Sequence, residues 1–125
     1  MNKYIIIDDL KQQRKTNKDM VTYYKKMIEQ DKIILSDAEK FFINEKNNIE
    51  WRSFDYHTLQ GIKQEQGYYY KKDNIPVEVI ENNIDEARNR INMYRKEIIS
   101  LTDNTNWINS LEQNNWKNLN KEMGL

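Results

Sequence analysis

The stretch that decides the fold is residues 77–101, VEVIENNIDEARNRINMYRKEIISL. Its apolar residues recur at alternating intervals of three and four, the spacing that aligns side chains along one stripe of an α-helix. Pro76 comes directly before it and suits the first turn of a helix, because the amide that proline lacks would have no partner there. The pattern predicts one long helix over about residues 76–102. The stripe, called the seam below, consists of Val77, Ile80, Ile84, Ala87, Ile91, Tyr94, Ile98 and Leu101.

The seam has two interpretations. In the favoured one it is the core face of a helix that packs within its own chain. In the other it joins two chains in a coiled coil, and the flanking charges then favour an antiparallel homodimer that sets Glu81 against Arg95 of the other chain. A parallel pair would instead bring Arg90 close to Arg95 of the other chain. The oligomer seam of this second interpretation comprises Ile80, Ile84, Ala87, Ile91, Tyr94 and Ile98.

The residues before the seam predict two helices and a small sheet. Residues 9–30 have an amphipathic helical pattern, with residues 4–7 as a short strand or an extra turn and a break near residues 16–17 as an alternative. A capping pattern at residues 36–39 predicts the start of a second helix, which the Asn47-Asn48 pair ends. Residues 49–72 are rich in strand formers, so we expect a minor antiparallel β-hairpin there, with a loop or short helix between its strands.

The residues after the seam predict a turn and a last helix. The polar run at residues 102–106 favours a turn. The helix that follows, to about Met123, either breaks near residues 114–115 or buries two faces, because Trp107 and Trp116 fall on different sides of it. The whole chain is therefore predicted to be a mainly α single domain over residues 1–125.

Composition and motifs exclude several functions. Lysine plus arginine equals aspartate plus glutamate at 20 each, so no overall charge steers the protein to nucleic acid or membranes. The chain has no cysteine, which excludes thiolate catalysis and cysteine-ligated metals. His57 is the only histidine, and the three glycines offer no phosphate-binding loop. We therefore expect no catalytic residues, no metal, no cofactor and no enzymatic activity.

The apolar run at residues 4–7 ends at Asp8. It is too short for the core of a signal peptide or for a membrane span. We expect a cytoplasmic protein with no membrane partner.

Aromatic residues between positions 51 and 70 are the main candidates for binding. Tryptophan, tyrosine and arginine are enriched among the residues that dominate the energy of protein interfaces. The alternative is that these rings fill the core of a protein poor in leucine and valine. The candidate partner-binding residues are Trp51, Arg52, Tyr56, Tyr68, Tyr69 and Tyr70.

A stripe of bases in the first helix is a second candidate surface. It could contact phosphates, although a solvated helix face is the favoured interpretation of such a stripe. The candidate nucleic-acid residues, called the lysine stripe below, are Lys11, Arg14, Lys15, Lys18, Lys25 and Lys26.

These features together predict a non-enzymatic protein that acts by occupying a surface of a protein partner. The abundance of Asn, Lys, Ile and Tyr is typical of AT-rich genomes, so an accessory protein of a phage or mobile element, for example an inhibitor, is a hypothesis. The alternative is a small nucleic-acid-binding regulator that combines the lysine stripe with the aromatic residues.

Overall fold

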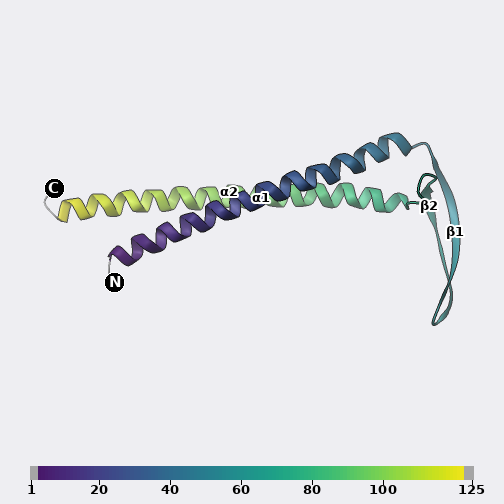
Figure 1. Ribbon diagram of the computed structural model, residues 1–125, viewed down its shortest axis with the longest axis horizontal. Coiled ribbons are helices and arrows are strands. Elements are labelled where there is room, and N and C mark those ends of the chain that lie inside the picture. The colour runs from purple at the N-terminus through teal and green to yellow at the C-terminus, as the bar shows by residue number, and fades with distance from the viewer. Residues whose placement is uncertain (1–2, 123–125) are drawn as a thin grey trace. The chain divides into compact units, whose positions relative to one another are not determined.

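The computed structural model describes the backbone of residues 3–122 and the side chains of residues 8–114. The elements follow in the order α1 (Lys3–Glu45), β1 (Ile49–Thr58), β2 (Gly61–Tyr70) and α2 (Val77–Glu122) (Figure 1). This order confirms the mainly α prediction and the β-hairpin within residues 49–72. Within the described part of the chain, no helix has an apolar stretch long enough to cross a membrane.

The chain divides into two compact units. Unit 1 comprises Met1–Glu29 and Ile91–Leu125, and therefore holds the first part of α1 and the later part of α2. Unit 2 is Gln30–Arg90, which contains the remainder of both helices together with the hairpin. Each unit thus pairs segments that are far apart in the sequence.

The helix α1 is continuous, so the prediction of two helices separated before residue 36 was wrong. The capping pattern at residues 36–39 lies in the middle of the helix, where Ala38 is buried and Leu35 half-buried. Burial of one unbroken stripe outweighs a local capping signal, because helices in proteins are stabilised mostly by the packing of one face. Residues of this stripe are spaced alternately by four and three: Leu10, Arg14, Asn17, Val21, Tyr24, Ile28, Asp31, Leu35 and Ala38.

The helix α2 also continues through residues 102–106, where the sequence predicted a turn, and through residues 114–115, where a break was one of two alternatives. Within residues 102–106, which are helical, two polar side chains bond back to the helix itself. The hydroxyls of Thr102 and Thr105 donate to the carbonyls of Ile98 and Leu101, at 2.7 and 2.9 Å. The half-buried Thr105 and the buried Ile108 extend the spacing of the seam. The predicted second face of the last helix, with Trp116 and Met123, lies outside the described side chains.

The seam packs within its own chain, as the favoured interpretation states. In unit 2, Ile80 packs in a core with Ala38 and Tyr70, against which Val77 and Ile84 also pack. In unit 1, the ring of Tyr94 stacks on that of Tyr24, with centroids 5.6 Å apart. Of the seam residues, Ile80, Ala87 and Ile91 are buried, and Val77, Ile84, Tyr94, Ile98 and Leu101 are half-buried.

Polar pairs join α1 to α2 in unit 1. The buried side chain of Asn17 donates from Nδ2 to Oδ1 of Asn104 at 2.7 Å and to Oγ1 of Thr105 at 3.3 Å. Arg14 forms an ion pair with Glu112 at 2.5 Å. Buried polar groups need specific partners, so these contacts favour one alignment of the two helices over alignments shifted by a turn.

The hairpin is a two-stranded antiparallel sheet whose register runs from Ile49 opposite Tyr70 to Thr58 opposite Gly61. Only residues 59 and 60 connect the strands, so neither a long loop nor a short helix separates them. Gly61 has φ +124°, a conformation that residues with a side chain rarely adopt. At the base of the hairpin, the amide of Tyr70 donates to the carbonyl of Ile75 at 2.8 Å.

Candidate functional site: an aromatic pair on an uncovered hairpin

One face of the hairpin carries two exposed aromatic rings. Trp51 and Tyr68 are directly opposite each other, and their rings meet edge to face with centroids 5.0 Å apart. Trp51 is 57% exposed and Tyr68 is 61% exposed, although their ring contact covers part of each. Nearer the tip, His57 and Ile62 form a further opposed pair on this face, and both are exposed. Trp51 and Tyr68 are called the aromatic pair below.

The opposite face is occupied mainly by contacts within the hairpin. The ring of Phe54 meets that of Tyr69 edge to face at 5.2 Å, and Arg52 forms an ion pair with Glu50 on the same strand. Tyr69 is buried and Arg52 is half-buried. These contacts leave Arg52 and Tyr69 less available to a partner than the aromatic pair.

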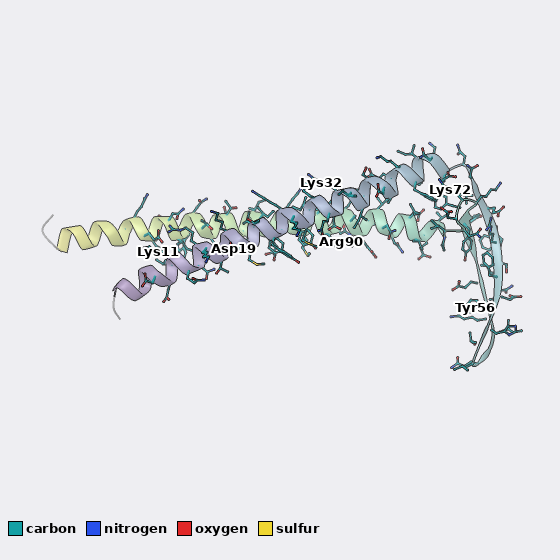
Figure 2. The ribbon with its side chains drawn as sticks, viewed as in Figure 1. Lys11, Asp19, Lys32, Tyr56, Lys72 and Arg90 are labelled. Atoms are coloured by element: carbon teal, nitrogen blue, oxygen red, sulfur yellow. The ribbon has the colours of Figure 1, made fainter. Side chains whose placement is uncertain are left out.

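Tyr56 lies on the hairpin well away from its base (Figure 2). Its hydroxyl donates to Oε1 of Glu65 on the other strand at 3.2 Å. Its ring is exposed, so Tyr56 is accessible on the face opposite to the aromatic pair.

Tyr70 belongs to the core. Its side chain is 0% exposed and its ring meets that of Phe41 edge to face at 4.9 Å. The alternative that the aromatic residues fill the core therefore describes Tyr69 and Tyr70, whereas Trp51, Tyr56 and Tyr68 lie at the surface.

The buried hydroxyl of Tyr70 makes the free energy of unfolding of the protein sensitive to alkaline pH. Burial raises the pKa of Tyr70 above its usual value of 10.0, and the charge of Glu81 raises it further. The folded state therefore holds the hydroxyl proton of Tyr70 more tightly than the unfolded state does. The stability that the protonated hydroxyl contributes is complete below about pH 10 and is lost as the pH rises through the folded-state pKa. We expect the free energy of unfolding to fall more steeply above about pH 10 in the wild type than in Tyr70→Phe. Urea titrations below and above this pH measure the two slopes, and equal slopes would contradict the prediction.

The lysine stripe is in unit 1, whereas the aromatic pair is in unit 2. Arg14 is half-buried, and besides its ion pair with Glu112 it donates to Oδ1 of Asn109 at 3.1 Å. Its charge is therefore already compensated within the protein. The five lysines of the stripe, Lys11, Lys15, Lys18, Lys25 and Lys26, are all exposed.

An open groove of about 820 Å³ lies in unit 2 between β2 and the first turns of α2. Its lining includes apolar groups and three carboxylates but no base: Glu65, Tyr68, Tyr69, Pro76, Val77, Glu78, Val79 and Glu81, with Gln66, Gly67 and Asn82 completing it. Among the residues that the structure describes, no cluster of three or more acidic or histidine side chains is arranged to hold a metal.

An exposed apolar residue at the tip of the hairpin is not among the candidates predicted from the sequence. Leu59 is in the two-residue turn and is fully exposed. A signal was available, because a leucine in a tight turn has few neighbouring side chains to cover it.

No protein-family model matches the chain, and no significant match is found among curated proteins or solved structures.

Proposed function

We propose that the protein is a non-enzymatic binding protein whose aromatic pair occupies a surface of another protein. The observation that carries the proposal is that Trp51 and Tyr68 pack on each other and are both more than half exposed. Aromatic rings bury a large area at little cost in side-chain entropy and are the residues that most often dominate interface energies. The contact between the two rings holds them in place before a partner arrives, which reduces the entropy lost on binding.

The charges of the hairpin favour a protein over a nucleic acid as the partner. Residues 49–70 include three acids, Glu50, Asp55 and Glu65, and two bases, Arg52 and Lys63. Nucleic-acid binding depends on bases that neutralise phosphates. The hairpin has no excess of bases over acids, whereas the cores of protein interfaces are commonly rich in aromatic residues and poor in charged ones.

Capture of proteins from an extract of the source cells tests the proposal. We expect Trp51→Ala/Tyr68→Ala to lose the specific partner, because truncating one dominant interface residue costs about 2 kcal/mol or more, roughly a thirtyfold loss of affinity. Trp107→Ala is the matched control, since Trp107 is 58% exposed but lies on α2 in unit 1. Mass spectrometry of the retained proteins is the measurement. If the hairpin variant retains the same proteins as the wild type, or the control loses them equally, the aromatic pair is not the binding surface.

A further inference from the structure

The outer edge of β2 has backbone groups without partners in the described part of the chain. At the base, the amide of Tyr70 points away from β1 to Ile75, whereas that of Lys71 points toward β1 and donates to Asn48. Alternate residues of a strand direct their backbone groups to opposite sides. The groups of Ile62, Gln64 and Gln66 therefore point away from β1, where no backbone hydrogen bond joins them to another described segment.

An isolated two-stranded hairpin is only marginally stable in water, and an open edge is a template for another strand. Tyr69 already has Pro76 beside it in an antiparallel bridge, so the base of this edge is occupied. The open part is therefore residues 61–67, between the turn and that bridge.

We propose that this edge pairs with the same edge of a second copy, antiparallel and about a twofold axis at Gln64, to form a four-stranded sheet. The inference concerns a surface distinct from the aromatic pair and does not depend on the proposed function. In this register Gln64 faces Gln64 of the second copy, and Ile62 faces Gln66 on either side of the axis. These three pairs direct their backbone groups toward each other, which gives about six intermolecular hydrogen bonds.

The charges of β2 select this register. With the axis at Gln64, Lys63 of each copy faces Glu65 of the other, which creates two opposite-charge pairs. An axis at position 63 would set lysine against lysine, and an axis at position 65 would set glutamate against glutamate; like charges directly opposite are destabilising. Both side chains are exposed, and neither forms an ion pair among the described residues. On β1, by contrast, the opposite charges of Glu50 and Arg52 already form an ion pair with each other.

Charge reversal tests the pairing. Sedimentation equilibrium of the full-length wild type from micromolar to millimolar concentration should show a reversible dimer. Lys63→Glu and Glu65→Lys each place two like-charge pairs in the interface, so we expect each to raise the dimer Kd by about tenfold or more. An equimolar mixture of the two variants restores both opposite-charge pairs and should form a heterodimer with wild-type affinity. Circular dichroism of each variant checks that the fold is retained.

Cysteine cross-linking tests the register itself. The chain has no cysteine, so a single introduced thiol reports without background. Gln64→Cys places the thiol on the twofold axis next to its own copy and should give a disulfide-linked dimer on mild oxidation. Gln66→Cys is the control, because position 66 faces position 62 and should give at least about tenfold less of the linked dimer.

Three results would overturn the proposal: no rescue in the mixture of variants, cross-linking at position 66 rather than 64, or a wild type that stays monomeric throughout. If that monomer binds an extended lysine-rich peptide, the edge is assigned to a basic partner segment, in keeping with the carboxylates Glu65, Glu78 and Glu81 of the adjacent groove.

Discussion

Replacing Arg90 with alanine is expected to lower the free energy of unfolding by about 3–5 kcal/mol, because it leaves the carboxylate of Asp31 buried without its counter-charge. The side chain of Asp31 is only 5% exposed. Two nitrogens of the Arg90 guanidinium contact this carboxylate. Nε lies 3.1 and 3.2 Å from the two carboxylate oxygens, and the terminal Nη2 lies 3.0 Å from Oδ1. Total stabilities of small domains are about 5–15 kcal/mol, so this single change would remove a large part. Urea unfolding followed by circular dichroism measures the loss.

Two comparisons make the prediction specific. Arg88 pairs with Glu39 at 2.9 Å in the same unit, but both side chains are well exposed, so Arg88→Ala should cost about 1 kcal/mol or less. Asp31→Leu/Arg90→Met removes both charges together and should recover most of the loss, because well-packed apolar residues often replace a buried ion pair without penalty. A cost for Arg88→Ala equal to that of Arg90→Ala would show that burial of the carboxylate is not the cause.

The second large effect is expected from Asp103→Pro, which should destabilise the protein by about 3 kcal/mol or more. Residue 103 is in the segment whose polar sequence predicted a turn, but the structure places it inside α2. A proline there removes the backbone hydrogen bond to the carbonyl four residues earlier and its ring clashes with that carbonyl. In a turn, the same substitution would be tolerated. The measurement is the midpoint of urea unfolding together with the helical circular dichroism signal.

Asp103→Ala is the matched control, because it removes the same exposed side chain and keeps the backbone amide. Alanine has the higher helix propensity, so this variant should be as stable as the wild type or more stable by a few tenths of a kcal/mol. A proline variant within about 1 kcal/mol of the alanine variant would be inconsistent with a continuous helix at this position.

The proposed function and the proposed dimer would reinforce each other if both hold. A four-stranded sheet joined through β2 keeps β1 at each outer edge, so each copy still presents its own aromatic pair. Two linked binding surfaces raise the apparent affinity for a partner with two sites, without any new contact. Because Lys63 and Glu65 are separate from Trp51 and Tyr68, failure of one proposal leaves the other testable.

The sequence by itself determined the seam of α2 and the presence of the hairpin. The seam could be predicted because apolar residues occupy every third or fourth position. This helical period is visible in the sequence without knowing which segment packs against it. The hairpin could be predicted because strand-forming residues lie at both ends of residues 49–72, and Gly61 and Gly67 interrupt the stretch between them. The sequence also contains no catalytic motif, and its aromatic residues indicated candidate binding positions without identifying the partner.

Only the tertiary structure decided that both helices are continuous. In α1, polar residues such as Asn17 and Asp31 occupy positions of the buried stripe, and in α2 Thr105 does so. A pattern based on apolar residues breaks at such positions. They are compatible with burial because Asn17 meets Asn104 and Thr105 and Asp31 meets Arg90, partners that lie far away in the sequence.

The tertiary structure also decided which aromatic residues are at the surface. Tyr68 and Tyr70 point to the same face of one strand, so the alternation of residues along the strand predicts the same burial for both. Tyr70 is nevertheless buried and Tyr68 is exposed. The physical reason is that the hydrophobic core extends only to the base of the hairpin. There, residues of α1 and α2 such as Phe41 and Ile80 pack around Tyr70 and the opposed Ile49.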